Sequence, residues 1–316
     1  MNIDILKEES MDMTDVLIIG AGPAGLNAAL YAARKELTVT VVAKDIGGQM
    51  LLTSEIENYL GIPSVSGFEM ADRMEKQVRQ YPVDIVYAGV KSLTKDGDGY
   101  FTAHLDDGKE LRGKTCIVTA GKHSRTLGIP GEKEYTGRGV SYCATCDAMF
   151  YRKKTVAIVG GGDSAVQAAI EMAKLCPKVY LVVRSRIRAQ EILVKRMNAA
   201  DNVEVLLGYT PEEVKGEKKV SALTVKNKAD GSLHDIAVDG VFVEAGGIPN
   251  NSYLPKEVKT NSLGEIMTNK EGETTVDGLF AAGDVTDTRN KQIIIAAGEG
   301  ASAALAAHEY LLRTEP

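Results

Sequence analysis

The sequence has no tryptophan, and aromatic residues make up only 5 % of its 316 residues. Its four cysteines are too few for the disulfide scaffold of a small secreted domain. No stretch approaches the roughly 18 consecutive apolar residues that a membrane-spanning helix needs. Residues 1–15 are acidic and lack the apolar centre of a secretory signal. We therefore expect no membrane association and a cytoplasmic, reducing location, where a close cysteine pair is usually catalytic or metal-binding.

Basic residues are in the minority, with 37 Lys and Arg against 43 Asp and Glu and a net charge of -6. A nucleic-acid binder usually carries an excess of positive charge that neutralises phosphates. The charge balance therefore argues against nucleic acid as a partner. The hydrophobic fraction of 44 % and the charged fraction of 25 % are ordinary for a folded protein. The length fits two domains or one large α/β unit.

Glycine, by contrast, is abundant, with 32 residues in the chain, about 10 % against ~7 % in average proteins. One glycine cluster is G-A-G-P-A-G at 20–25, between the apolar run 16–19 and an alanine-rich stretch at 26–34. A second apolar run follows at 38–42. This order predicts a strand, a glycine loop, a helix and a second parallel strand.

Each glycine of that loop has a role in a dinucleotide-binding turn. Gly20 would allow the tight turn, Gly22 would let a pyrophosphate approach the backbone, and Gly25 would let the helix pack against the strand. Pro23 suits the opening turn of the helix, because its missing N–H would be unpaired there. The helix N-terminus would then offer N–H donors to the anion.

The same pattern recurs about 140 residues later. Strands are expected at 155–159 and 178–183, with the loop G-G-G-D-S-A at 160–165 and a helix at 166–175 between them. Gly160, Gly162 and Ala165 occupy the three positions of the fingerprint. Because each copy lies between a strand and a helix, the sequence predicts two dinucleotide-binding units.

The residues after each second strand bear on the ligand of each unit. Arg184, Arg186 and Arg188 follow the strand of the second unit, with no acidic residue among them. Such cations favour NADPH, whose ribose carries a 2′-phosphate, although a solvated basic loop is the alternative. In the first unit Lys44 and Asp45 follow Ala43, so no acidic residue is cleanly placed for the ribose of NAD.

The stretch Cys143-Ala144-Thr145-Cys146-Asp147 carries the expected redox chemistry. Two cysteines separated by two residues at a helix start can close a small disulfide ring, and one such thiol often has a lowered pKa. Asp147 is an acid beside the pair that could move a proton. A zinc site would need a second ligand pair, which Cys116, Cys176 and the four histidines do not supply. We therefore expect no metal, and expect Cys116 and Cys176 to be small buried hydrophobes.

Motifs along nearly the whole chain resemble those of the low-molecular-weight thioredoxin reductases, which are class II pyridine nucleotide-disulfide oxidoreductases. The matching stretches are I-G-A-G-P-A-G at 19–25, G-G-Q at 47–49, I-E-N-Y at 56–59, T-A-G at 119–121, G-R-G-V-S-Y-C-A-T-C-D at 137–147, G-G-G-D-S-A at 160–165, P-N at 249–250 and A-A-G-D-V at 281–285. The most specific of them is C-A-T-C-D beside the second glycine loop.

The resemblance implies an α/β fold of two Rossmann-like three-layer domains, the second inserted in the first. Residues 1–125 plus 249–316 would form a discontinuous FAD-binding domain, and 126–248 an NAD(P)H-binding domain that carries the redox pair. Hinges are expected near 122–128 and 246–252. The residues expected along FAD are Gly20, Gly22, Pro23, Ala24, Gly25, Lys44, Asp45, Gly48, Gln49, Asn58, Ala120, Gly121, Gly283, Asp284, Lys291, Gln292 and Ile293. Those expected along NADPH are Gly160, Gly162, Asp163, Ser164, Ala165, Arg184, Arg186 and Arg188.

The resemblance further implies a homodimeric thioredoxin-disulfide reductase. Hydride would pass from NADPH to FAD, and electrons from there to the Cys143–Cys146 disulfide and then to thioredoxin. Cys146 would face the flavin, Cys143 would attack the partner, and Asp147 would act as acid and base.

Two departures from the family pattern leave alternatives open. Val183-Arg184-Ser185 stands where the family has His-Arg-Arg, although Arg188 fits a later arginine of the pattern and Arg186 can compensate. Lys291-Gln292 replaces an Arg-Gln pair, which keeps a charge but not the planar fork of arginine. The donor could therefore be NADH, reduced ferredoxin or a reduced deazaflavin, and the partner another thioredoxin-like or glutaredoxin-like protein. A non-enzymatic nucleotide sensor is a third reading, from a different class.

Overall fold

The computed structural model describes residues 13–53 and 55–314, so most of the acidic segment 1–15 lies outside the described residues. The chain forms two compact units. One contains the residues up to His123 together with those from Pro249 onward, and the other is Ser124–Ile248. These divisions lie two residues before the expected boundary at 125/126 and at the expected boundary at 248/249. None of the helices in the described ranges has the length and apolar character needed to cross a membrane.

The first unit is built on a mixed sheet with a parallel centre. Its strands run in the order β3-β2-β1-β6-β5-β4, and β17 pairs with the second half of β6. They are β1 (Thr14–Ala21), β2 (Val39–Ile46), β3 (Val83–Tyr87), β4 (Val90–Lys95), β5 (Phe101–Leu105), β6 (Glu110–Val118) and β17 (Leu279–Ala281). Strands β3, β2, β1, β6 and β17 are parallel, whereas β5 and β4 are antiparallel.

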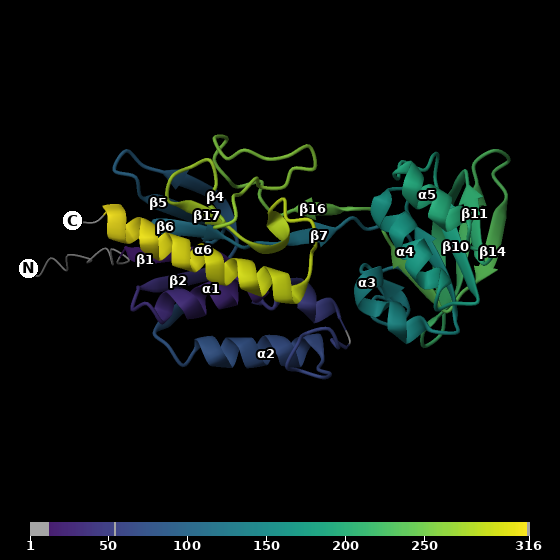
Figure 1. Cartoon of the computed structure of the whole chain (residues 1–316), viewed down its shortest axis with the longest axis horizontal. Helices are drawn as coiled ribbons and strands as arrows, with labels where there is room; N and C mark the ends of the chain where they lie inside the picture. The colour runs from purple at the N-terminus through teal and green to yellow at the C-terminus, as the bar shows by residue number, and fades with distance from the viewer. Residues whose placement is uncertain (1–12, 54, 315–316) are drawn as a thin grey trace, which may run out of the picture. The chain divides into compact units, whose positions relative to one another are not determined.

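Alternate residues of β1 enter two different cores. Val16 and Ile18 pack beneath α1 (Pro23–Ala33) and α6 (Ile293–Thr314), while Leu17 and Ile19 pack on the other face, among residues of β4, β5 and the segment 253–285. Figure 1 shows α6 running beside α1. The other helices of this unit are α2 (Gly67–Val78) and the 3-10 turns η1 (Gly48–Leu52) and η3 (Gly283–Val285). The sheet is thus covered on both faces, as a central parallel sheet requires.

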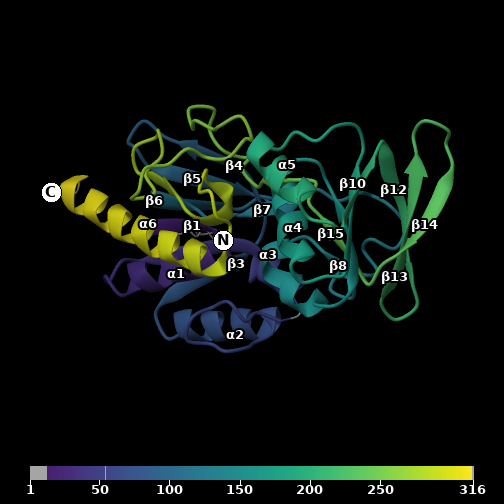
Figure 2. The same ribbon diagram turned by 45° about the vertical axis from the view of Figure 1, so that its right-hand side comes forward.

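The second unit has a parallel sheet of its own in the order β11-β10-β9-β15-β8. Its strands are β8 (Val140–Ser141), β9 (Thr155–Val159), β10 (Lys178–Val183), β11 (Val203–Leu207) and β15 (Gly240–Val243), and its helices are α3 (Ala144–Asp147), η2 (Ala148–Tyr151), α4 (Asp163–Ala173) and α5 (Glu191–Asn198). An antiparallel sheet of β12 (Tyr209–Gly216), β13 (Val220–Asn227) and β14 (Leu233–Ala237) forms a third layer, visible in Figure 2. The segments that join the units, β7 (Lys122–Ser124) and β16 (Gly247–Pro249), pair with each other.

The predicted α/β class with two Rossmann-like units is confirmed, and the predicted strands 155–159 and 178–183 have these same bounds. Both glycine-loop helices begin three residues earlier than expected, at Pro23 and Asp163. Gly22 and Gly162 are their N-caps, and the first i→i+4 bonds run from Leu26 and Val166 back to these glycines. A helix can begin before its apolar pattern does, because its first turn faces the loop.

Candidate functional site

The first glycine loop joins β1 to α1 with no room for side chains at two of its three glycines. A Cβ on Gly20 would lie 2.5 Å from the carbonyl oxygen of Thr119, and one on Gly25 would lie 1.9 Å from that of Gly20. At Gly22, in contrast, the nearest atom to an added Cβ is 4.0 Å away. Only the middle glycine therefore opens outward, which is where a phosphate would approach the N–H groups at the start of α1.

Residues far apart in the sequence gather around this loop. A Cβ on Gly48 would lie 3.9 Å from the Cα of Gly22, so the turn that precedes η1 faces the glycine loop. That turn is held by Asp45, whose Oδ1 accepts the N–H of Gly48 at 3.1 Å. Asn58 donates through Nδ2 to Oε1 of Gln292 at 3.1 Å, across 234 positions of sequence.

Other expected FAD residues lie in the same unit but use their polar groups within the protein. Gln49 donates to the carbonyl oxygen of Lys122. The carbonyl oxygens of Ala120 and Gly121 accept from the side chain and the backbone N–H of Asn250. Pro23 and Ala24 open α1, and Ile293 opens α6. The stem of Lys44 packs beside Gly89, where an added Cβ would lie 2.4 Å from its Cε.

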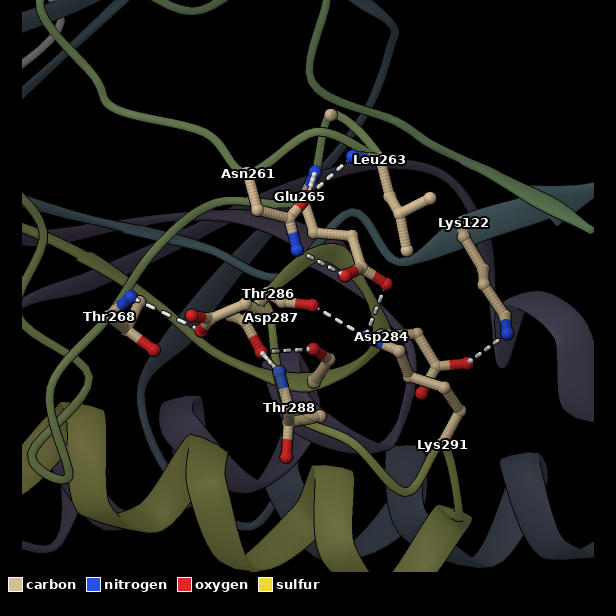
Figure 3. A network of polar contacts seen from close by, with 12 residues as sticks. Lys122, Asn261, Leu263, Glu265, Thr268, Asp284, Thr286, Asp287, Thr288 and Lys291 are labelled. Carbon is tan, nitrogen blue, oxygen red and sulfur yellow. Dashed lines mark hydrogen bonds and ion pairs between the residues drawn. The ribbon is translucent and has the colours of Figure 1, made fainter. Parts of the chain in front are cut away.

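A polar network surrounds η3 (Figure 3). Asp284 lies 4.0 Å from the ammonium nitrogen of Lys122, and burial raises the pKa of the Asp284 carboxyl while Lys122 and Lys291 oppose that shift. Lys291 pairs with Glu265 at 3.1 Å, with only 14 % and 17 % of the two side chains exposed, and donates to the carbonyl oxygen of Thr286. The Lys291 ammonium is thus bound to protein groups, and its charge acts on Asp284.

The second glycine loop has the same design. A Cβ on Gly160 would lie 2.4 Å from the carbonyl oxygen of Glu244, whereas Gly162 has no atom within 4 Å of an added Cβ. Ala165 is fully buried in the third position, and Ser164 is exposed. Both carboxylate oxygens of Asp163 accept from Gln190, at 2.8 Å from its backbone N–H and 3.0 Å from its side chain. Asp163 therefore holds the segment that follows β10.

The arginine segment lies against this loop. The backbone N–H of Arg188 donates to the carbonyl oxygen of Gly161 at 2.6 Å, and the carbonyl oxygen of Arg186 lies 3.0 Å from a Cβ built on Gly161. Arg184, Arg186 and Arg188 are all exposed. The structure therefore brings the three predicted arginines to the same edge of the sheet as the loop they are expected to serve.

The cysteine pair closes a disulfide at the start of α3. Cys143 and Cys146 are bonded, with their Cα atoms 5.3 Å apart, and Cys143 is the N-cap whose Sγ accepts the N–H of Cys146 at 3.3 Å. The N–H of Cys143 donates to Oγ of Ser141 at 3.1 Å. The turn is thus fixed by its own backbone as well as by the disulfide.

Asp147 ends α3, one residue after the pair. Burial raises the pKa of its carboxyl, and a hydrogen bond with Ser141 acts in the opposite direction. A carboxyl whose pKa is raised toward neutrality can give up a proton as well as take one, which is the property that proton transfer to a thiolate needs.

The remaining thiols have no such environment. Cys116 and Cys176 are free and buried, as predicted, and burial raises the pKa of both. Within residues 13–53 and 55–314, no three His, Cys, Asp or Glu side chains are grouped so as to hold a metal ion. The redox pair is therefore the place where thiol chemistry is expected.

Several residues of the site escaped the sequence reasoning. Thr119 bonds the carbonyl oxygens of Ile19 and Gly20, and Glu299 accepts the N–H of Gly283 at 2.8 Å. Ser141 and Glu244 both bond the redox turn. Thr119 and Ser141 lie within motifs noted above, which was a usable signal. Glu244 and Glu299 belong to no local pattern, since only the tertiary fold brings them to their partners.

Comparison with known proteins places the chain in context. The model of the family described as pyridine nucleotide-disulphide oxidoreductase matches residues 14–300. The F polypeptide of alkyl hydroperoxide reductase from Pseudomonas putida is 40% identical over 312 residues, which cover 98% of this chain and 60% of that protein. NADH dehydrogenase from Bacillus subtilis is 40% identical over 301 residues, covering 95% and 59%. The chain therefore spans about three fifths of the length of these curated relatives.

A solved structure covers the chain more evenly. Thioredoxin reductase from Streptococcus pyogenes superimposes with a TM-score of 0.90 at 40% sequence identity, over 95% of this chain and 99% of that one. The similarity thus extends over both units and over the redox motif between the two glycine loops.

Proposed function

We propose that this chain, which belongs to the pyridine nucleotide-disulphide oxidoreductase family, is a flavin-dependent thioredoxin-disulfide reductase that takes its electrons from NADPH. The observation that carries the proposal is the Cys143–Cys146 disulfide, followed by a buried carboxyl, in a chain with two open glycine loops. The likeness to a thioredoxin reductase over 99% of that protein's chain supports the choice of partner. We expect the enzyme to act in the cytoplasm as a homodimer.

The two glycine loops fit two dinucleotides. At Gly22 and Gly162 the backbone is open where a side chain would stand, so each loop can receive a pyrophosphate. We assign FAD to the first unit, whose loop is ringed by Asn58, Gln292 and Asp284, and NADPH to the second, whose loop adjoins the three arginines. FAD, when bound, supplies the chemistry that turns a hydride from NADPH into two electrons for a disulfide.

The residues of the redox turn divide the remaining work. Two electrons and two protons convert the Cys143–Cys146 disulfide to two thiols, and Asp147 is placed to move one of the protons. The Cys143 thiolate attacks a partner disulfide and forms a mixed disulfide with it, releasing one partner thiolate. Cys146 then attacks the Cys143 sulfur, which re-forms the internal disulfide and releases the second partner thiolate.

Exchanging Cys143 for serine tests this division. We expect Cys143→Ser to bind FAD and accept hydride from NADPH like the wild type, while NADPH-dependent reduction of thioredoxin falls to the background rate. The change removes one sulfur of the pair and leaves both glycine loops intact. Cys176→Ser, at a buried cysteine outside the pair, is the matched control. A Cys143→Ser variant that still reduced thioredoxin at the wild-type rate would refute the proposal and favour the nucleotide-sensor reading.

The electron donor has a second candidate. The three exposed arginines favour NADPH, whereas the 40% identity to a protein named NADH dehydrogenase favours NADH. We expect the double variant Arg184→Ala/Arg186→Ala to raise the KM for NADPH about tenfold or more, because each guanidinium lost weakens binding of the 2′-phosphate. The KM for NADH should change little. Equal effects on the two KM values would contradict the assignment, and rapid flavin reduction by reduced ferredoxin or deazaflavin alone would replace it.

A further inference from the structure

A carboxylate from another part of the second unit lies against the redox turn. Glu244 directly follows β15, and its backbone carbonyl packs against Gly160 of the nucleotide loop. Its side chain reaches the other way, since Oε1 accepts the N–H of Ala144 at 3.2 Å. Ala144 is the residue bonded directly to Cys143. One residue therefore contacts both the second glycine loop and the turn that carries the disulfide.

The N–H donors of the turn have different kinds of acceptor. Cys143 donates to the hydroxyl of Ser141, and Cys146 donates to the sulfur of Cys143. Both of those acceptors are neutral while the disulfide is closed. The N–H of Ala144 instead donates to the carboxylate of Glu244. A negative charge is thus held by a directional bond next to the sulfur that becomes a thiolate on reduction.

This charge affects the two redox states differently. The closed disulfide is neutral, whereas reduction by two electrons and two protons gives two thiols, one of which ionises to a thiolate by losing a proton. A nearby negative charge raises the pKa of that thiol and disfavours the thiolate. Because a stabilised thiolate makes a disulfide easier to reduce, a destabilised one makes it harder to reduce.

We propose that Glu244 holds the Cys143–Cys146 disulfide at a more negative reduction potential, which makes the reduced pair a stronger reductant toward a partner disulfide. Glu244 is in this sense a positioning residue, since it acts through the cysteines and exchanges no electrons itself. The inference deepens the proposed function, on which it rests for the source of the electrons.

Other ionisable groups lie on the elements packed around the turn. They are Asp147 at the end of α3, the buried Tyr151 of η2, and Asp163 at the start of α4, whose carboxylate is bound to Gln190. All three are retained when Glu244 is changed. A difference between the variants and the wild type therefore reports the Glu244 charge alone.

The potential can be measured directly on the full-length, flavin-loaded protein. Wild type, Glu244→Gln, Glu244→Ser and Glu244→Asp are equilibrated anaerobically in glutathione redox buffers at neutral pH, and the thiols are trapped by alkylation and counted by mass spectrometry. We expect Glu244→Gln to make reduction of the pair about tenfold more favourable, which corresponds to about 30 mV. Glu244→Asp should stay near the wild type, because it keeps the charge. Glu171→Gln, at an exposed glutamate of α4, should change nothing.

A second readout separates charge from structure. The rate of Cys143 alkylation against pH should give a thiol pKa lower in Glu244→Gln than in the wild type, although glutamine can still accept the N–H of Ala144. The proposal is overturned if the neutral variants that fold have the wild-type potential, or if Glu171→Gln shifts it equally. Neither readout uses NADPH, so a failure to accept electrons from NADPH would contradict the proposed function and not this inference.

Discussion

At the scale of single residues, the site depends on the environment of two acids more than on their identity. Asp147 and Asp284 are both carboxyls whose pKa burial raises, but Asp284 has two lysines acting against that shift, whereas Asp147 has only a hydroxyl hydrogen bond. Positive charge stabilises the carboxylate, so Asp284 is suited to remain an acceptor. Asp147 is the better proton carrier of the two.

This difference predicts the effect of Asp147→Asn. Turnover with thioredoxin should fall about 100-fold, which is typical for the loss of a general acid or base. Because the pKa of Asp147 is raised on folding, its stabilising contribution is present below its unfolded pKa and is lost as the pH rises through the folded pKa. The variant should therefore resist urea better than the wild type at pH 7.

Urea unfolding followed from pH 7 downward checks this sign. The gap in the free energy of unfolding should narrow as the pH approaches ~4, where the wild-type carboxyl is protonated in both states. An Asp147→Asn variant less stable than the wild type at pH 7 would show that burial does not control this carboxyl. Asp107→Asn, at an exposed aspartate of the first unit, is the control.

At the scale of elements, two glycines of one loop do different work. Gly25 lets α1 pack on the strand before it, since a Cβ there would lie 1.9 Å from the carbonyl oxygen of Gly20. Gly22 has ordinary backbone angles, with φ -78, and open space beside it. Gly25 is needed by the fold, and Gly22 by whatever approaches the loop.

Alanine at each position separates these roles. Gly25→Ala should lower the free energy of unfolding by about 3 kcal/mol, because α1 must move away from β1. Gly22→Ala should leave stability within about 0.5 kcal/mol of the wild type but weaken FAD binding at least tenfold. Gly162→Ala, the equivalent change in the second loop, should weaken NADPH binding and spare FAD. Flavin fluorescence and nucleotide titration measure these affinities, and a Gly162→Ala protein that lost FAD would reverse the assignment of the two units.

The elements also show how far sequence reasoning reaches. The two glycine loops, their flanking strands and the C-x-x-C turn are local patterns, and their spacing was sufficient to place them. The starts of α1 and α4 were expected too late, because the first turn of each helix faces the loop and carries no apolar signal. The run at 215–219 was expected to be a loop, but Lys215 and Gly216 belong to β12, where Lys215 pairs with Asp235 on β14.

Long-range contacts lay beyond the same reasoning. Asn58 meets Gln292, and Glu244 meets Ala144, because parallel strands bring their carboxyl ends to one edge of a sheet whatever their distance in sequence. Resemblance to a family supplied Asn58 and Gln292 as separate expectations without their contact. Glu244 had no such guide, since a single glutamate after a buried strand has no distinctive pattern.

At the scale of the whole molecule, the chain is two nucleotide-binding units with one inserted in the other. The redox pair belongs to the inserted unit, which also carries the loop assigned to NADPH, while the loop assigned to FAD is in the other unit. The proposed electron path therefore requires both units in one chain. Each protein chain should store two electrons in the flavin and two more in the cysteine pair.

Anaerobic titration of the purified, flavin-loaded protein with NADPH tests that central claim. The account predicts that full reduction takes about two equivalents of NADPH per chain, with one disulfide lost and two alkylatable thiols gained. Cys143→Ser should need about one equivalent. A wild-type protein whose flavin is bleached by one equivalent, with the Cys143–Cys146 disulfide still intact, would contradict the account.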